Sequence, residues 1–442
     1  ERYRQPPPMP SYQAPRGMRD LLPEDAAAFD ALQAVIQARA QRYGYPRIET
    51  PTVEERAVFQ KSAGEASDIV THEMFDVSLH GTDGLVLRPE GTAAVVRAYL
   101  EHGLQKSPQP QRFYYWEAMF RGQRPQLLRY RQFWQWGLEC IGAAEPGADL
   151  EQIEYTSGLF REVGLTEYTL KINTVGETAV QPKIREALRS YFEGYRAELS
   201  DDSKKRLETN VLRIFDSKAP RDREIAAGAP KLRELVSDVD RAHFTALIAG
   251  LDRVGVAYEV DERLARGFDY YRRTVFEFIL TNPEFTRSGD IAVAAGGRYD
   301  GLVRTMGGPD VPGVGIAGGI DVLLAALKQQ GAKVADEPKA DVYVVSAEAD
   351  DPADRMQLAT PLREAGFTVA IDYSTRSLER QIESAVKHGA RVAVIRGTPE
   401  ARGGNVIVRD LVNKEQRVTR LAAVVTEVGR HVPKRERPTL KG

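Results

Sequence analysis

The fold is constrained most by a series of short β-rich runs between residues 84 and 139. Aliphatic and aromatic residues dominate residues 85–87, 112–116 and 132–136, and segments rich in turn-forming and charged residues separate these runs. Short runs with this spacing are typical of an antiparallel sheet. Because a charge inside such a sheet is costly without a partner or a ligand, a site is expected where charged residues interrupt the strands.

A basic hairpin joins two of these runs. Between Met119 and Phe133, four arginines surround a turn that contains Pro125. A guanidinium group matches two phosphate oxygens at once, so this hairpin is a candidate phosphate-binding element. Taken alone, the same residues are equally typical of a hairpin with solvated arginines, and the neighbouring segments have to decide between the two interpretations.

Two further segments supply polar groups close to this hairpin. Glu90 lies at a turn between a proline and a glycine. Gln135 and Glu139 lie four residues apart on the strand that leaves the hairpin, so both side chains point to the same face. Carboxylate and amide oxygens accept hydrogen bonds from an ammonium group, and the nearby arginines suit an anion. An amino acid and ATP together have this polarity.

A third segment, residues 264–271, places Arg266 and the phenols of Tyr270 and Tyr271 beside a glycine, just before a predicted strand at residues 274–279. Taken alone it is a weak indication of a site, because neighbouring tyrosines usually pack in a core. Its value depends on the other segments.

The chain divides into regions of different composition. Residues 1–14 are rich in proline and are predicted to be disordered. Residues Pro23–Tyr43 are predicted to form an amphipathic helix that Gly44 ends. Charged helical sequence from Lys183 to Leu251 interrupts strand-like sequence, which indicates a helical domain inserted into a sheet domain at about residues 178–252.

A second domain is predicted at the C-terminal end. A polar linker, residues 328–340, precedes it. Within residues 341–430, apolar runs alternate with helical sequence, which is typical of a small α/β domain. The basic segment at residues 431–442 is interpreted as a solvated tail rather than as an RNA-binding element.

Composition excludes several classes of protein. The chain has 442 residues, 42% hydrophobic and 28% charged, so two or three globular domains are expected. No apolar run approaches the about 20 residues of a membrane span and no secretory signal is recognisable, so a cytoplasmic protein is expected. A single cysteine, Cys140, excludes an internal disulfide, and six histidines without metal-ligand spacing argue against a transition metal. The net charge of −2 neither favours nor excludes RNA.

Taken together, the motifs resemble those of class II aminoacyl-tRNA synthetases. The arginine hairpin resembles motif 2 of this class, Gly44–Pro51 resembles motif 1, and Gly313–Leu327 has the position of motif 3. Within the class, RPEGT at Arg88–Thr92, RGFDYY at Arg266–Tyr271 and AGGRYDGL at Ala295–Leu302 resemble the signatures of histidyl-tRNA synthetases.

The resemblance extends from about Pro15 to Val428 and includes both predicted domains. It implies an α+β class II catalytic domain over residues 15–327, in which helices flank an antiparallel sheet and which contains the helical insertion. A C-terminal α/β anticodon-binding domain over residues 341–430 follows. It also implies a homodimer with motif 1 at the interface.

The resemblance implies a reaction in two steps. The carboxylate of L-histidine attacks the α-phosphate of ATP to give histidyl-adenylate and pyrophosphate, and the terminal ribose hydroxyl of tRNA(His) then attacks the acyl carbon. Neither step needs a covalent enzyme intermediate, so catalysis rests on positioning and on charge stabilisation at phosphorus. Arg121 and Arg266 are the expected catalytic residues, and Mg²⁺ is expected to accompany the β- and γ-phosphates.

The binding residues follow from the same motifs. The residues expected to bind histidine are Glu90, Gly91, Thr92, Arg121, Gln135, Glu139, Arg266, Tyr270 and Tyr271. Those expected to bind ATP are Arg121, Arg129, Tyr130 and Phe133. Phe133 is expected to stack on adenine, although plain packing is an alternative for it and for its two neighbours. The two tyrosines are expected to read the imidazole by hydrogen bonds, which rejects isosteres that lack the partner.

The sequence departs from the family pattern in two motifs. Motif 3 normally carries an arginine that packs on adenine and reaches the γ-phosphate, and Val322 has its position. Loss of that charge is expected to weaken ATP binding by ~1.5–3 kcal/mol unless another cation substitutes, for which Arg298 and Arg304 are candidates. In motif 2, Gln123 replaces a usual glutamate and Leu127–Leu128 replace a usual Lys-Gly pair, which concerns contacts to the tRNA acceptor end.

Two other functions are compatible with such a chain. A regulatory subunit of ATP phosphoribosyltransferase has the catalytic fold and senses histidine without charging tRNA, and Val322 favours it. The intact segment at residues 266–271, the arginine hairpin and the anticodon-like domain favour the synthetase. An RNA-binding adaptor built on an inactive synthetase would bind tRNA without turnover. Histidine-dependent exchange of pyrophosphate into ATP, measured beside tRNA charging, distinguishes the three.

Overall fold

The computed structural model divides into two compact units, Glu1–Asp336 and Glu337–Gly442. The residues that it describes are 12–63, 70, 73–79, 81–123, 127–264, 270–287, 289–332, 334–335, 339–348, 352–401 and 403–433. Most of the predicted disordered extension and of the predicted basic tail therefore lies outside the described residues, as does Arg266.

The first unit is built on a seven-stranded sheet with the order β4-β5-β10-β9-β8-β6-β7. Its strands are β4 (Gln111–Phe120), β5 (Gln132–Ile141), β6 (Tyr168–Thr174), β7 (Glu259–Val260), β8 (Arg272–Leu280), β9 (Ala292–Arg298) and β10 (Gly313–Gly319). Neighbouring strands are antiparallel except β6 and β7. The predicted antiparallel sheet is confirmed, and the arginine hairpin joins its strands β4 and β5.

Alternation along β5 decides which residues reach the site. The helices that pack on one face are α1 (Pro23–Arg42), α4 (Pro146–Val163), α9 (Asp238–Val254) and α12 (Ile320–Gln329). Trp136 and Leu138 of β5 are buried against this layer. Because successive side chains of a strand point to opposite faces, Gln135 and Glu139 lie on the other face. The helices that contribute to that side are α3 (Thr92–Glu101) and the short α11 (Leu302–Thr305).

A small sheet places the turn that carries Glu90. Its strands are β1 (Val53–Glu55), β3 (Thr82–Leu87) and β2 (Phe75–Leu79), in this spatial order, and α2 (Arg56–Ala63) packs on it. Just after β3, the buried side chain of Arg88 donates hydrogen bonds to the carbonyls of Thr50, at 2.5 Å, and Ala118, at 2.9 Å, and pairs with Glu117 at 3.0 Å. This buried arginine fixes the Glu90 turn against β4.

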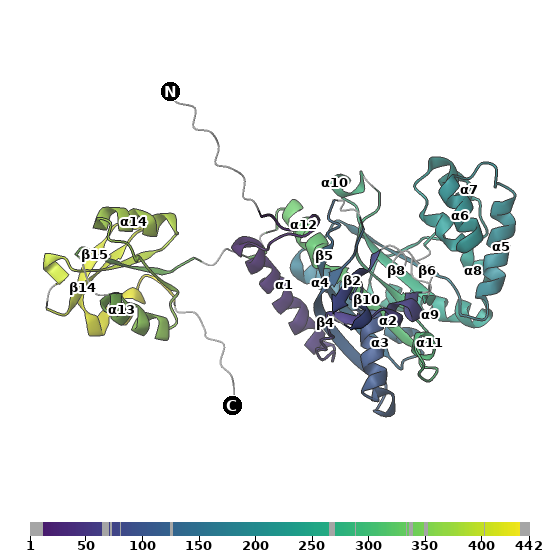
Figure 1. Cartoon of the computed structure of the whole chain (residues 1–442), viewed down its shortest axis with the longest axis horizontal. Helices are drawn as coiled ribbons and strands as arrows, with labels where there is room; N and C mark the ends of the chain where they lie inside the picture. The colour runs from purple at the N-terminus through teal and green to yellow at the C-terminus, as the bar shows by residue number, and fades with distance from the viewer. Residues whose placement is uncertain are drawn as a thin grey trace, which may run out of the picture. The chain divides into compact units, whose positions relative to one another are not determined.

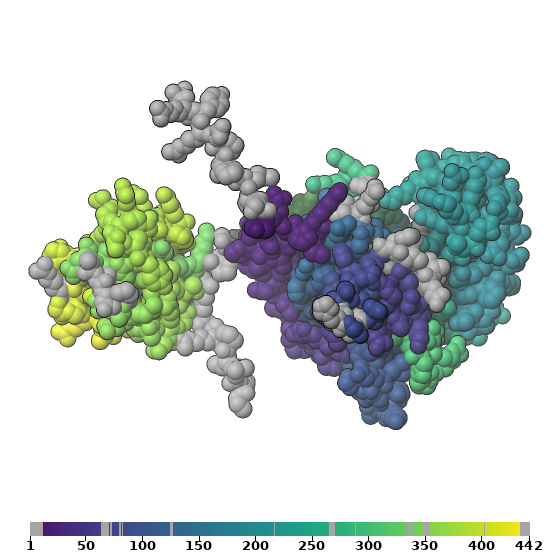
Figure 2. Space-filling model, viewed as in Figure 1, coloured from purple at the N-terminus to yellow at the C-terminus, as the bar shows by residue number. Residues whose placement is uncertain are grey.

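A helical insertion separates β6 from β7. The insertion contains α5 (Gln181–Glu193), α6 (Asp201–Thr209), α7 (Pro220–Ala227) and α8 (Leu232–Leu235), followed by α9. The first four helices share a core that includes Ile184, Leu188 and Phe192, whereas α9 packs on α4 and on the large sheet. Figures 1 and 2 show α5 to α8, in teal, as a separate lobe beside the sheet.

The second unit is a small α/β domain. Its sheet has the order β12 (Val369–Ile371), β11 (Val342–Ser346), β13 (Val392–Arg396), β14 (Asn405–Asp410) and β15 (Gln416–Arg420). The first three strands are parallel, and β14 and β15 add antiparallel. Its helices are α13 (Pro352–Glu364), α14 (Leu378–Lys387) and α15 (Val424–Val428). The predicted α/β domain is confirmed.

Within the described parts of the chain, every helix is too short or too polar to cross a membrane.

Candidate active site

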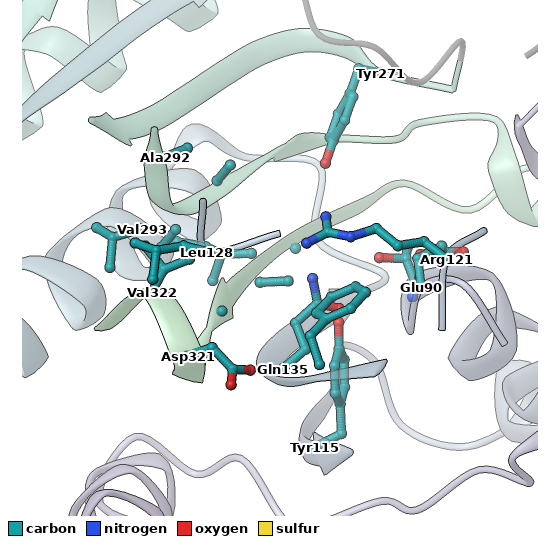
Figure 3. Close-up of a pocket in the computed structure, with 18 of the residues that line it drawn as sticks. Glu90, Tyr115, Arg121, Leu128, Gln135, Tyr271, Ala292, Val293, Asp321 and Val322 are labelled. Carbon is teal, nitrogen blue, oxygen red and sulfur yellow. Dashed lines mark hydrogen bonds between the residues drawn. The ribbon is translucent and has the colours of Figure 1, made fainter. Parts of the chain in front are cut away.

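A cavity of about 250 Å³ lies on the face of the large sheet that carries Gln135 (Figure 3). The sequence-predicted residues that line it are Glu90, Thr92, Arg121, Phe133, Gln135, Tyr270 and Tyr271. They come from the start of α3, from the arginine hairpin, from β5 and from the segment before β8. Because the hairpin continues directly into β5, these elements make up three segments that are far apart in the sequence, and the fold brings them together.

Glu90 presents a buried carboxylate at the start of α3. Its two oxygens accept hydrogen bonds from the backbone N–H groups of Thr92, at 2.7 Å, and Ala93, at 2.8 Å. Burial raises the pKa of Glu90 to about 7, and these two N–H groups oppose the rise by stabilising the anion. The carboxylate is therefore partly ionised near neutral pH and gains from a cationic ligand.

Glu139 lies behind the cavity rather than on its surface. It is fully buried and accepts hydrogen bonds from the hydroxyls of Thr92, at 2.8 Å, and Tyr299, at 2.7 Å. Burial raises the pKa of this carboxyl to about 8, against the effect of those two hydroxyls. Because Thr92 and Tyr299 both line the cavity, Glu139 orients two side chains that do.

Gln135 carries a polar atom that has no hydrogen-bond partner among the described residues. Its Oε1 is buried and accepts no hydrogen bond from the described residues. A buried carbonyl oxygen normally has a donor, so this atom is suited to the N–H of a ligand. Figure 3 shows that Gln135, Arg121 and Tyr271 approach the same space from different sides.

The two tyrosines of the predicted histidine signature form one wall. The ring centroids of Tyr270 and Tyr271 are 4.8 Å apart, and Tyr270 stands edge-on to Tyr299 at 6.2 Å. In Figure 3 the hydroxyl of Tyr271 points into the cavity. Burial raises the pKa of Tyr270 well above its ordinary value, so this phenol stays protonated at neutral pH. A phenol in this state donates or accepts a hydrogen bond.

Arg121 supplies the positive charge of the cavity. Its Nε donates to the carbonyl of Tyr130 at 2.9 Å, and its guanidinium carbon lies 4.2 Å from the ring centroid of Phe133. Burial, and to a smaller extent the charge of Arg129, lower the pKa of Arg121 to about 10. It remains charged at neutral pH, and its desolvated charge favours an anion.

The end of the cavity beyond Arg121 is mostly apolar. Leu128, Val293, Ile316 and Val322 line it together with the carboxylate of Asp321. Figure 3 shows Leu128, Val293 and Val322 grouped on one side. The position that the family pattern gives to an arginine is therefore part of a mostly apolar wall here.

Neither arginine proposed to compensate for Val322 reaches this cavity. Arg298 is fully buried away from it, where its guanidinium donates to Asp149 at 2.8 Å and to the carbonyls of Ala143 and Glu145. Arg304 is on the surface and pairs with Asp310. That expectation is wrong, because both guanidinium groups are already used elsewhere.

The other predicted residues are not part of the cavity lining or lie outside the described residues. Gly91 is packed against Tyr115, so that an added Cβ would be 2.5 Å from the ring. Arg129 and Tyr130 belong to the hairpin but are not part of the lining, and Arg266 lies outside the described residues. The lining residues that were not predicted include Tyr115, Tyr299 and Asp321, although strand alternation places Tyr115 on the same face as Phe113 and Met119.

The described residues contain no cluster of three His, Cys, Asp or Glu side chains that could hold a metal ion. At the apolar end, both oxygens of Asp321 already accept hydrogen bonds, from Arg19 at 2.8 Å and from the backbone N–H of Trp134 at 3.2 Å. These residues do not fit a protein-held Mg²⁺, whose ligands are several free oxygens in octahedral geometry.

Comparisons with known proteins agree with this architecture. The family described as Histidyl-tRNA synthetase matches residues 17–323, and the one described as Anticodon binding domain matches residues 341–431. A histidine-tRNA ligase of Mycobacterium tuberculosis is 38% identical over 418 residues, which cover 95% of this chain and 97% of that relative. A histidine-tRNA ligase of a Cyanothece species is 40% identical over 410 residues, covering 93% and 94%. The crystal structure of apo histidyl-tRNA synthetase from S. aureus has a TM-score of 0.78 and 32% identity, covering 94% of this chain and 99% of that one.

Proposed function

Because this chain belongs to the histidyl-tRNA synthetase family, we propose that the cavity on its large sheet is the place where L-histidine and ATP react. The chain is an ATP-dependent ligase that activates L-histidine as histidyl-adenylate and transfers it to tRNA(His). The near-complete match to ligases favours this function over the histidine-sensing regulatory subunit.

Histidine occupies the polar end of the cavity in this proposal. Its ammonium group donates to the carboxylate of Glu90 and to the Oε1 of Gln135, which lacks a partner among the described residues, and its carboxylate faces Arg121. The imidazole lies against Tyr270 and Tyr271, whose phenols read its two nitrogens. Support comes from the unpaired amide oxygen and from two buried charges of opposite sign, which a zwitterion matches.

ATP occupies the apolar end. Phe133 and the aliphatic wall that includes Val322 hold adenine, and the α-phosphate lies at Arg121. For adenine to reach the Phe133 face that the Arg121 guanidinium now covers, this guanidinium has to turn toward the phosphate. We propose that Arg266, known here from sequence alone, joins it there. Mg²⁺ would be bound by the phosphates of ATP, because the described residues contain no group of carboxylates that could hold it.

The side chains then act by position and charge. Glu90 and Gln135 orient the amino acid so that its carboxylate oxygen lies in line with the bond from α-phosphorus to the leaving pyrophosphate. Arg121 offsets the negative charge that collects on the α-phosphoryl oxygens in the transition state. A single well-placed donor of this kind contributes about 3 kcal/mol, on the order of a hundredfold in rate.

The remaining parts follow from the same assignment. The second unit, which matches an anticodon-binding family, is proposed to contact the anticodon of tRNA(His). A homodimer with motif 1 at the interface is proposed from the family resemblance. Because translation consumes the product, the proposed location is the cytoplasm.

The observation that carries the site assignment is the convergence of Arg121, Glu90 and Gln135 on one cavity. The test measures histidine-dependent exchange of pyrophosphate into ATP, and tRNA charging. Arg121→Ala and Arg266→Ala should each lose exchange at least a hundredfold. Arg42→Ala is the matched control, because Arg42 is an exposed arginine that pairs with Glu162 on the far face of the sheet. Exchange that survives Arg121→Ala would remove the assignment.

A further inference from the structure

A buried carboxylate faces the proposed nucleotide end of the cavity. Asp321, at the start of α12, is only 7% exposed and lines the cavity beside Val322. A buried anion next to a bound polyphosphate raises the energy of the complex by like-charge repulsion. It also attracts Arg121, since the charge of Asp321 is one of those that act on the guanidinium of Arg121. Without a compensating positive charge, Asp321 would weaken the binding of ATP. It would also compete with the phosphates for the guanidinium of Arg121.

Arg19 provides the compensating charge. One of its terminal nitrogens donates to Asp321 at 2.8 Å, and the guanidinium carbon lies 5.0 Å from the ring centroid of Tyr130. The contact spans 302 positions of the sequence. It is anchored by the backbone, because the N–H of Arg131 in the hairpin donates to the carbonyl of Gly17 at 2.7 Å. The segment before α1 is thus held against the hairpin that contains the proposed ATP-binding residues Arg121, Arg129 and Tyr130.

Because Lys328 compensates the charge of Asp25, the charge of Arg19 compensates that of Asp321. The other terminal nitrogen of Arg19 donates to Asp25 at 2.9 Å, but Asp25 also accepts from Lys328 at 2.7 Å. The four side chains form a chain of alternating sign, Lys328, Asp25, Arg19 and Asp321. The sum is zero with Arg19 present and −1 without it. The surplus negative charge would lie at the cavity.

We propose that Arg19 is a positioning residue for ATP: it neutralises Asp321, so that the nucleotide end of the cavity accepts phosphate and Arg121 stays available to it. The proposal rests on the proposed function, because it takes this cavity to be the ATP site. It also assigns a role to an arginine far from the motifs, in a chain where Val322 has the position of the motif 3 arginine.

The test compares the KM values for ATP and histidine in pyrophosphate exchange. Arg19→Gln should raise KM for ATP on the order of tenfold, because one unit of surplus charge then lies next to the phosphates. KM for histidine should change less than about twofold, since the polar end is built from other segments. In the double variant Arg19→Gln with Asp321→Asn the surplus charge is gone, and KM for ATP should return to within about threefold of the wild-type value.

A control variant and a folding check distinguish a specific effect of Arg19 on ATP binding from a general loss of structure. Arg16→Gln is the matched control, because Arg16 is in the same segment but contacts the hairpin through its backbone carbonyl, with an exposed side chain. Thermal unfolding of each variant checks folding. An unchanged KM for ATP in Arg19→Gln would overturn the proposal, and so would a raised KM that the second substitution fails to restore, because Arg19 would then act other than by cancelling Asp321. Exchange by the wild-type protein tests the proposed function independently of all variants.

Discussion

Substitution of Gly315 by alanine tests the placement of the carboxylate behind the cavity. Gly315 on β10 pairs with Glu139 on β5, and an added Cβ would lie 2.0 Å from Oε2 of Glu139 and 3.0 Å from the backbone carbonyl of Leu138. The Leu138 carbonyl is part of the sheet and cannot give way. The carboxylate must therefore move, although Thr92 and Tyr299 hold it at 2.8 Å and 2.7 Å.

The expected loss of stability combines two terms. Overpacking a filled core costs about 1–3 kcal/mol. Displacing the carboxyl group weakens one of its hydrogen bonds, which is worth about 0.5–1.5 kcal/mol because a pKa of about 8 leaves Glu139 mostly protonated at neutral pH. Partial relaxation leaves a sum of about 2–4 kcal/mol, which lowers the melting temperature of the first unit by several degrees. Because Thr92 loses its orientation, KM for histidine should rise about tenfold, and KM for ATP should change less.

The assay is differential scanning calorimetry, which separates the transitions of the two units, together with pyrophosphate exchange at varied histidine. Gly147→Ala is the matched control, because the space around an added Cβ at Gly147 is open within 4 Å and the residue lies in α4. Alanine there should leave stability unchanged or raise it by up to about 1 kcal/mol. Equal melting temperatures and equal histidine KM values for the two variants would refute the predicted position of Glu139.

Two further predictions follow from the buried charges. Because burial raises the pKa of Glu90 to about 7, lowering the pH protonates it and removes the acceptor for the ammonium group. From pH 8 to pH 6, kcat/KM for histidine, corrected for the titration of its imidazole, should fall about tenfold, and a flat profile would exclude this role. Arg298→Met should cost about 3–5 kcal/mol, because the fully buried Asp149 would lose the guanidinium that it contacts at 2.8 Å. Adding Asp149→Asn should recover part of this loss in the melting temperature, and a single variant as stable as wild type would contradict the buried pair.

The sequence predicted correctly which side chains of β5 share a face. It did not predict which of them reach the cavity and which lie behind it. Alternation along β5 correctly placed Gln135 and Glu139 on one face. It could not show that Gln135 lines the cavity while Glu139 lies behind it. That difference arises from Tyr299, which is 160 positions away from Glu139 and takes one carboxylate oxygen. Contacts of this kind depend on how β5, β10 and β9 align, and single-strand patterns carry no information about them.

The error about Arg298 could have been avoided from the sequence. Arg298 is the last residue of β9 and Tyr299 follows it in extended sequence, so their side chains point to opposite sides of the sheet. Once a tyrosine of this signature is placed in the cavity, its arginine neighbour has to point toward α4, where it meets Asp149. The contact between Arg19 and Asp321 is different, because nothing in either segment indicates the other.

The cavity contains two buried charges that the protein leaves without full compensation, and the proposed function uses both of them to recognise an amino acid. Burial raises the pKa of Glu90 and lowers that of Arg121, so each charge is held at a cost in free energy. Replacing either residue with an apolar side chain would remove that cost and with it the means of orienting the substrate. In the proposed complex a zwitterion offsets both costs at once, with its ammonium group at Glu90 and its carboxylate at Arg121. The carboxylate that is to attack phosphorus is thereby placed beside the same guanidinium that stabilises the phosphoryl charge, so binding and catalysis use one interaction.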